Sequence, residues 1–295
     1  MLGVINLDKP VGPTSHDMVA LVRRLSGLRR IGHAGTLDPL ASGVLPILVG
    51  RATRLSEELT GGSKRYRATI RLGYRSLTDD AEGPIEPVEA AVPDDAAIRV
   101  AAAEFVGTFD QLPPAFSARK RAGQVAHRAA RSGHPLDLPS RSVTVSSLEI
   151  DAITRGTASA EVDIDLRCGP GTYVRSIARD LGERLGCGAY LAALERTEAA
   201  GMNVSDGLSP TALERLAAAG RLAEAIRPLA DVLALTKVVV DRPTAERFLH
   251  GQTAPVSNQR AGRVAVFHAG TVLGIGELSE GTLRPHKVLV DEVEA

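Results

Sequence analysis

Residues 31–43 interrupt the regular patterns of the chain and are followed by an unbroken apolar run at 44–49. The interruption contains three glycines and one proline, which is typical of a loop whose backbone approaches another group closely. The apolar run suits a buried strand. We therefore expect a polar loop held against a rigid, buried support. Pro39 favours an extended conformation at Asp38, although an Asp before Pro is usually only a turn residue.

The remaining patterns predict strands interspersed with helices. Strands are expected at 2–7, 64–73, 141–153 and 157–167, and helices after a cap at Thr14 or Ser15, at 51–59, after a cap near Asp94, at 173–185 and within 209–233. The pattern changes in the last part of the chain. There we expect one helix near 243–249 and short strands at 237–240, 263–268, 272–277 and 287–290. The sequence thus predicts a large domain at 1–234 and a small β-rich domain at 235–295.

The charges cancel over the whole chain but not locally. Its 35 basic and 35 acidic residues exclude a uniformly basic coat that would bind nucleic acid indiscriminately. Residues 1–80 nevertheless hold 12 Lys and Arg against 7 Asp and Glu, and residues 111–147 hold 6 against 1. Two basic stretches are therefore available for an anionic partner.

No segment approaches the roughly 20 apolar residues of a membrane span, and Asp8 interrupts the first apolar run before a signal-peptide core can form. We expect a cytoplasmic protein without a membrane partner. Cys168 and Cys187 are too few for a disulfide framework and too far apart for a CxxC metal site, so we expect buried thiols and no bound metal.

Several motifs resemble, in the same order, those of one enzyme family. They are Gly32–Pro46 (GHAGTLDPLASGVLP), Lys64–Tyr66 (KRY), Gly171–Ser176 (GTYVRS) and Leu191–Thr197, accompanied by the segments 3–12 and 113–120. Together they resemble the bacterial tRNA pseudouridine-55 synthases, the TruB family. The resemblance implies an α+β fold, with a mixed, largely antiparallel sheet flanked by helices and a small C-terminal β-rich PUA-like domain.

The resemblance also implies an isomerase that converts uridine 55 in the T-loop of tRNA to pseudouridine without a cofactor or metal. Asp38 would be the nucleophile, and Arg175 would lie beside it and keep it ionised. Tyr66 would stack on the extruded base and lie near the site of proton transfer, while Tyr173 and Leu194 would complete the pocket. His33 would take part in flipping the base.

The second basic stretch is expected to be a mobile insertion, about 117–141, that orders over the T-arm and elbow of a tRNA bound by a monomeric enzyme. Two residues depart from the family pattern here, His127 in place of a tyrosine and Arg119 in place of an apolar residue. Phosphate contacts are expected from seven basic residues. These are Lys64, Arg65, Arg119, Lys120, Arg121, Arg128 and Arg131.

Two other classes of function are considered. A non-catalytic tRNA-binding or tRNA-folding protein on the same scaffold would have no need to keep Asp38, Tyr66 and Arg175 together. A phosphate-binding enzyme built on the loop is excluded, because 32–43 has neither a Walker lysine pattern nor a GxGxxG sequence.

Overall fold

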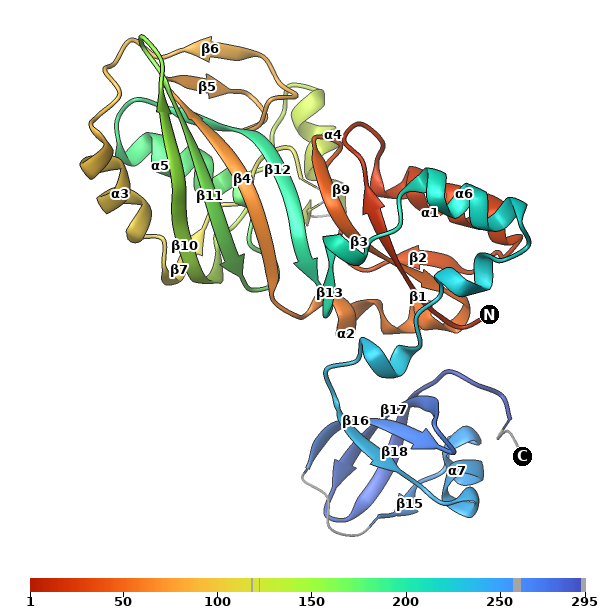
Figure 1. Ribbon diagram of the computed structural model, residues 1–295. Coiled ribbons are helices and arrows are strands. Elements are labelled where there is room, and N and C mark those ends of the chain that lie inside the picture. Colours follow the sequence, from red (N-terminus) through yellow and green to blue (C-terminus); the bar gives the residue numbers. More distant parts are fainter. Residues whose placement is uncertain (118, 122, 257–260, 293–295) are drawn as a thin grey trace.

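A computed structural model describes residues 1–117, 119–121, 123–256 and 261–292. Half of the described strands belong to one nine-stranded sheet, and a separate five-stranded sheet follows near the carboxyl end (Figure 1). The large sheet runs in the order β1 (Gly3–Lys9), β3 (Ala41–Val49), β12 (Ala189–Ala199), β4 (Lys64–Leu72), β11 (Ala160–Cys168), β10 (Arg141–Arg155) and β7 (Gly107–Gln111), with β2 (Ile31–His33) on β3 and β13 (Met202–Asn203) on β12.

One parallel pair, β12 with β3, joins two antiparallel halves of the large sheet. Leu194 and Arg196 of β12 lie opposite Ala41 and Gly43 of β3. The other neighbouring strands of this sheet pair antiparallel. The prediction of a mixed, largely antiparallel sheet with flanking helices and a β-rich C-terminal part is confirmed.

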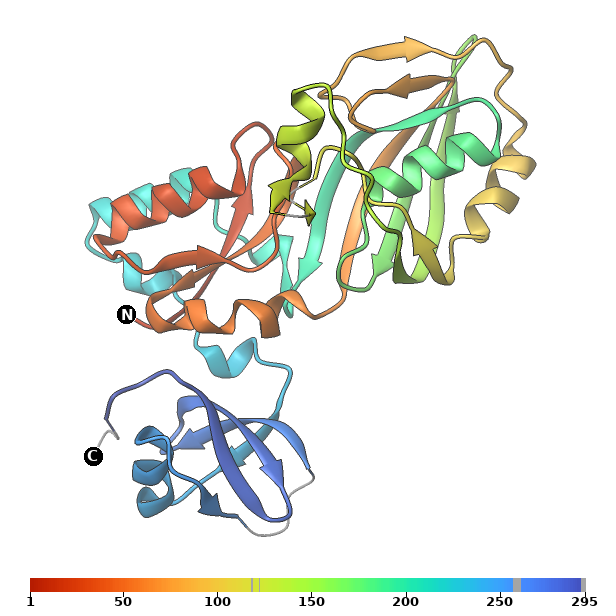
Figure 2. The same cartoon turned by 180° about the vertical axis from the view of Figure 1, so that it is seen from behind.

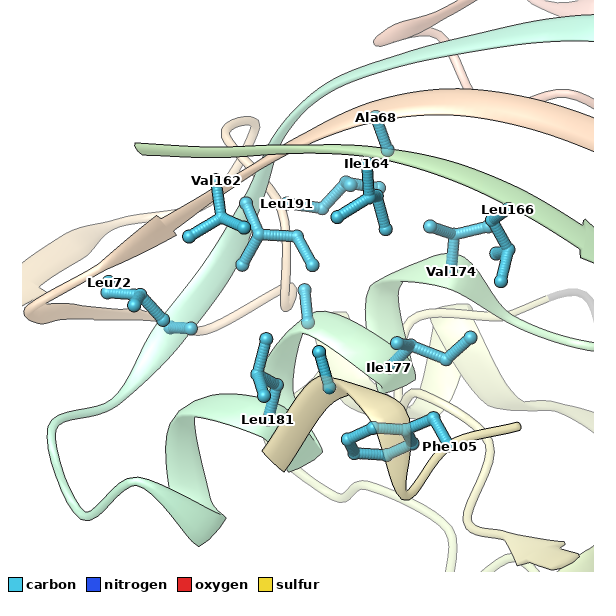
Figure 3. Close-up of a cluster of buried hydrophobic side chains, with 14 of the residues drawn as sticks. Ala68, Leu72, Phe105, Val162, Ile164, Leu166, Val174, Ile177, Leu181 and Leu191 are labelled. Atoms are coloured by element: carbon cyan, nitrogen blue, oxygen red, sulfur yellow. The ribbon is translucent and has the colours of Figure 1, made fainter. Parts of the chain in front are cut away.

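Helices cover one face of the larger half of this sheet (Figure 2). Figure 3 shows α5 (Val174–Arg184) packing its apolar side chains against those of β4, β11 and β12, with Phe105 filling the space beside it. The alternation in β4 sends Tyr66, Ala68, Ile70 and Leu72 into this core, so the intervening residues face the other side. Helix α3 (Asp95–Ala103) contributes Ile98 and Ala102 to the same core.

The amino-terminal half of the sheet is covered by α1 (Ser15–Ser26) and α6 (Pro210–Ala218). Helix α1 begins where the sequence indicated, because Thr14 and Asp17 form a capping box. The Thr14 side chain accepts a hydrogen bond from the Asp17 amide at 3.1 Å, and the Asp17 carboxylate accepts one from the Thr14 amide at 2.8 Å.

The smaller sheet has the order β14 (Thr236–Val239), β16 (Gly262–His268), β17 (Thr271–Ser279), β18 (Thr282–Val288) and β15 (Ala254–Pro255), and α7 (Arg242–Leu249) packs on it. It is attached through α2 (Ser56–Thr60). There Glu58, whose side chain is 5% exposed, pairs with Lys287 at 2.9 Å and Arg263 at 3.6 Å. Leu59 packs in the cluster that also holds Phe267 of β16.

Short elements complete the described chain. They are the 3₁₀ helices η1 (Gly50–Leu55), η2 (Val204–Asp206), η3 (Leu222–Ala225) and η4 (Leu229–Asp231), the hairpin of β5 (Tyr74–Ser76) and β6 (Ile85–Pro87), the hairpin of β8 (Lys120–Arg121) and β9 (Gln124–Val125), and α4 (Ala126–Arg131). Within the described ranges, no helix combines the length and apolar character needed to cross a membrane. Cys168 and Cys187 are buried free thiols, as predicted.

Three differences from the expected elements are informative. Strand β12 was not predicted, although it is central to the sheet. The predicted helix at 51–59 is mostly the 3₁₀ helix η1 with only the short α2 after it, and the last strand occupies 282–288 rather than 287–290. Strand pairing decided β12 and β18 over local propensity.

The contact of β12 with β3 predicts an intolerance at Gly43. Its φ of +97° is strained for other residues, and a Cβ there would overlap the carbonyl oxygen of Arg196. Gly43→Ala should therefore lower the free energy of unfolding by at least about 3 kcal/mol in urea titrations. Gly27→Ala is the matched control, because Gly27 also has a positive φ but has open space where its Cβ would lie. It should cost only about 1 kcal/mol, and equal losses at the two positions would refute the overlap.

Candidate active site

The loop carrying Asp38 connects β2 to β3, and its backbone is held at several points. The amide of Leu37 donates to Ser15 Oγ at 2.9 Å, and Ser15 Oγ donates to the Leu37 carbonyl at 3.0 Å. The Gly12 amide donates to the Pro39 carbonyl at 2.8 Å. The loop is irregular yet fixed to the start of α1, and it leaves the Asp38 side chain 37% exposed.

Two buried cations that the sequence did not single out also hold this loop. Arg196, on β12, is 1% exposed and donates to the carbonyls of Val44 at 2.8 Å and Gly35 at 2.9 Å. Lys9, at the end of β1, is fully buried, and its ammonium group donates to the carbonyls of Pro10 and Pro13 at 2.8 Å. Burial lowers the pKa of Lys9. Both side chains donate to backbone carbonyl oxygens, Arg196 to Gly35 of the loop and Val44 of β3, and Lys9 mainly to residues that follow β1.

Arg175, in the first turn of α5, lies beside Asp38 as predicted from the motif. Its Nε is 3.0 Å from Asp38 Oδ2, and only 5% of the arginine side chain is exposed. The guanidinium also lies 3.4 Å from Asp80 Oδ2 and donates to the carbonyls of Thr78 at 3.2 Å and Phe116 at 3.1 Å. The positive charge of this buried arginine is thus balanced by carboxylates on two sides.

Asp80 is a second carboxylate that sequence reasoning missed. It is 2% exposed and accepts hydrogen bonds from the Thr78 hydroxyl at 2.5 Å and the Glu82 amide at 3.0 Å. Its neighbour Asp79 has a φ of +62° and pairs with Arg179 at 3.1 Å, and burial raises the pKa of Asp79 to about 6. The only signal in the sequence was an acidic pair at the start of an acidic segment, which does not distinguish buried carboxylates from exposed ones.

One pocket of about 290 Å³ brings together most of the predicted catalytic and substrate-binding residues. Asp38, Tyr66, Tyr173, Arg175 and Leu194 all line it, together with Arg196 and Lys64. Tyr66 is 6% exposed, and burial raises its pKa, so its phenol is protonated at neutral pH. The pocket therefore combines aromatic and aliphatic side chains with one partly exposed carboxylate and three basic side chains, a combination suited to a flat ring with polar edges.

His33 lies on β2, outside the set of residues that line this pocket. Its ring packs edge-on against that of His16 on α1, with centroids 5.6 Å apart. Burial lowers the pKa of His33, and the neighbouring His16 and Arg196 lower it further, so the ring is neutral at physiological pH.

The positions of Lys64 and Arg65 argue against the predicted phosphate contacts. Lys64 is 8% exposed, and its ammonium group donates to the carbonyls of Thr60 at 2.7 Å and Gly62 at 2.8 Å. Arg65 faces the opposite side of the sheet, where it pairs with Asp165 at 2.7 Å. Adjacent residues of a strand point to opposite faces, so the two charges of the KRY motif cannot serve one RNA surface.

The other predicted phosphate contacts belong to the insertion that contains α4, on the same side of the sheet as α5 (Figure 2). Arg128 and Arg131 are exposed on α4, Arg119 is half-buried, and Arg121 pairs with Asp137 at 2.8 Å. The side chain of Lys120 lies outside the described part of the structure. His127, one of the departures from the family pattern, bonds to Ser117 through its amide at 3.0 Å.

Comparison with known proteins decides the family. Residues 23–174 match the model of the TruB family pseudouridylate synthase, N-terminal domain, and residues 236–289 match the model of the pseudouridine synthase II TruB C-terminal region. The chain belongs to the TruB family. It is 41% identical over 293 residues to the tRNA pseudouridine synthase B of Trichormus variabilis, covering 98% of both chains. It is 40% identical to that of Burkholderia pseudomallei, covering 98% of this chain and 97% of the relative.

The fold of this TruB family member also matches solved structures. A chain from the crystal structure of a Cbf5-Nop10-Gar1 complex superposes with a TM-score of 0.74 at 27% identity, covering 98% of this chain and 85% of that one. A chain from an archaeal box H/ACA sRNP Nop10-Cbf5 complex gives a TM-score of 0.72 at 26% identity. The agreement extends over the large sheet and the C-terminal sheet.

The buried ammonium of Lys64 predicts a pH-dependent stability. Burial lowers its pKa from the usual 10.5 to about 8. Between these pH values the unfolded chain holds a proton that the folded chain has released, so stability rises with pH in this window. From pH 7.5 to 9.5, the wild type should gain about 2 kcal/mol relative to Lys64→Met in urea titrations. A stability difference that stays constant with pH would show that the ammonium keeps its ordinary pKa.

Proposed function

We propose that this member of the TruB family is a tRNA pseudouridine synthase that isomerises uridine 55 in the T-loop. The observation that carries the proposal is the Asp38 carboxylate, partly exposed in a pocket of about 290 Å³ and paired with the buried Arg175 at 3.0 Å. The relatives at about 40% identity are tRNA pseudouridine synthases B, which supports the same activity.

The reaction needs a nucleophile and a closed pocket rather than a redox or electrophilic group. The bond from ribose C1′ to ring N1 breaks, the uracil ring turns, and C1′ joins ring C5. The proton on C5 is then lost, while N1 ends with a proton, so the atoms of the nucleotide are conserved. Asp38 serves as the nucleophile, and the ion pair with Arg175 holds its carboxylate in place.

Tyr66 and Leu194 would hold the uracil ring while it is detached. Tyr66 offers an aromatic face inside the pocket, and stacking on such a face compensates for part of the cost of extruding a base. Because burial raises the pKa of Tyr66, its phenol enters the reaction protonated, which favours stacking over removal of the C5 proton as its first role. Tyr173 would close the pocket from the side of α5.

The RNA outside the pocket would be held by the insertion at about 117–141. We propose that this insertion orders over the T-arm and elbow of the tRNA and that His33, at the base of the catalytic loop, helps to flip the base. The contacts within the insertion are local, such as the ion pair of Arg121 with Asp137. The carbonyl of Phe116, just before the insertion, accepts a hydrogen bond from Arg175. The enzyme would act as a monomer.

A non-catalytic tRNA-binding or tRNA-folding protein is the alternative. That function gives no reason to bury an arginine between two carboxylates inside a pocket, an arrangement whose desolvation is costly. Binding and refolding need only the outer surface.

Asp38→Asn tests the proposed chemistry. The amide keeps the shape of the side chain but removes the nucleophile, so turnover should fall by more than about a hundredfold while tRNA affinity changes by only a few fold. Turnover is measured as the label released from unmodified tRNA that carries tritium at uridine C5. Release by the wild type is the positive result, since a binding protein frees no label. A variant that retains more than about a hundredth of wild-type turnover would refute the assignment of Asp38.

Arg128 and Arg131 test the proposed RNA surface. Replacing both by Gln should weaken tRNA binding and reduce the slope of log affinity against log salt by about two phosphate contacts' worth. Arg65→Gln is the matched control, because this arginine faces the other side of the sheet. If Arg65→Gln flattens the salt dependence as much as the α4 pair does, the RNA surface lies elsewhere.

A further inference from the structure

Gln111, the last residue of β7, is 1% exposed and sits 62 positions before Tyr173 in the chain. Its side-chain amide forms a reciprocal pair of hydrogen bonds with the backbone of Tyr173. The Tyr173 amide donates to Gln111 Oε1 at 2.8 Å, and Gln111 Nε2 donates to the Tyr173 carbonyl at 3.0 Å. One side chain thus satisfies both peptide groups of one pocket residue, as a neighbouring strand would.

Tyr173 is the point from which α5 begins. It has an extended conformation, with φ of −103° and ψ of 114°, and its carbonyl also accepts the amide of Ile177 at 3.2 Å in the first turn of the helix. Fixing both of its peptide planes fixes the direction in which α5 leaves the turn. Tyr173 itself lines the pocket, and Arg175 follows two residues later.

The same two segments are joined by other hydrogen bonds that do not involve Tyr173. The carbonyl of Leu112, next to Gln111, accepts from Ser176 Oγ at 2.8 Å and from Arg179 Nη2 at 2.9 Å. These bonds attach the body of α5 to the segment after β7. Among the described side chains, Gln111 alone bonds to the backbone of Tyr173. A substitution of Gln111 therefore affects the orientation of the first turn of α5, while the hydrogen bonds of Leu112 still attach the helix.

We propose that Gln111 is a positioning residue for the isomerisation, which holds the backbone of Tyr173 so that Tyr173 and Arg175 meet the extruded uridine and Asp38 in the reactive geometry. This rests on the proposed function. Because a misplacement of about 1 Å near reacting atoms can cost about a hundredfold in rate, loss of this pair should reduce the rate of the chemical step. The affinity for tRNA depends on a much larger surface and should change little.

Gln111→Glu provides a pH-controlled test. A protonated carboxyl group can donate to the Tyr173 carbonyl and accept from its amide, as the glutamine does. An ionised carboxylate loses the donor and faces the Tyr173 carbonyl with a negative charge. Burial should raise the pKa of the introduced carboxyl group into an accessible range. The ratio of the single-turnover rate constant of the variant to that of the wild type should fall about tenfold or more between pH 5.5 and 8.5.

Ser176→Ala is the matched control. It removes one buried hydrogen bond between the same two segments but leaves the backbone of Tyr173 bonded to Gln111. Its rate ratio to the wild type should stay constant with pH, even though it loses thermal stability. A constant ratio for Gln111→Glu, or the same profile for both variants, would overturn the proposal.

Gln111→Met keeps the test decisive if the glutamate variant does not fold at the higher pH. It preserves the length of the side chain and removes both hydrogen bonds, so the single-turnover rate should fall about tenfold or more while the Kd for tRNA stays within about twofold. Wild-type turnover in this variant would overturn the proposal.

Hydrogen exchange of the Tyr173 amide, measured without RNA, should be faster in Gln111→Met than in the wild type, because its acceptor is lost. Equal exchange in the variant and the wild type would refute the role of Gln111 without affecting the proposed function. A wild-type protein that releases no label from tRNA would instead refute the proposed function.

Discussion

The buried guanidinium of Arg175 imposes a constraint that several distant parts of the chain must satisfy together. A charge that is 5% exposed is stable only if neighbouring opposite charges and acceptors balance it. Its partners come from the loop after β2, from the turn at Thr78 and Asp80, and from Phe116 at the root of the insertion. The geometry of the proposed active site therefore depends on how this one buried cation is balanced, and a shift of any of these segments would move Arg175 relative to Asp38.

Sequence reasoning located the parts of the site that depend on local rules. The loop at 34–40 was visible within a loss of periodicity at 31–43, whose two ends belong to β2 and β3, and α1 was visible through its cap at Thr14, because both are determined by neighbouring residues. The identity of Asp38, Tyr66 and Arg175 as a group came from motif resemblance, since local features at Asp38 indicated no more than a turn. The structure adds the common pocket around them.

The residues that were missed are those whose role is purely tertiary. Lys9, Asp80, Gln111 and Arg196 are polar side chains buried by segments far away in the sequence, and a polar residue carries no local sign of burial. Strand β12 was missed because its Ala, Leu, Glu and Arg residues are helix formers, and its pairing with β3 and β4 overrides that tendency. The alternation of β4, which places Lys64 and Arg65 on opposite faces of the sheet, was already visible in the sequence.

The attachment of the C-terminal sheet to α2 has a consequence for how this protein could exchange parts during evolution or engineering. Glu58 is balanced by Lys287 and Arg263, and Leu59 shares a cluster with Phe267. Removal of the carboxyl-terminal sheet would leave the Glu58 carboxylate without its basic partners and would expose apolar surface on both fragments. The appended sheet is therefore not a freely detachable module, and a shortened descendant of this chain would need compensating substitutions on α2 to remain monodisperse.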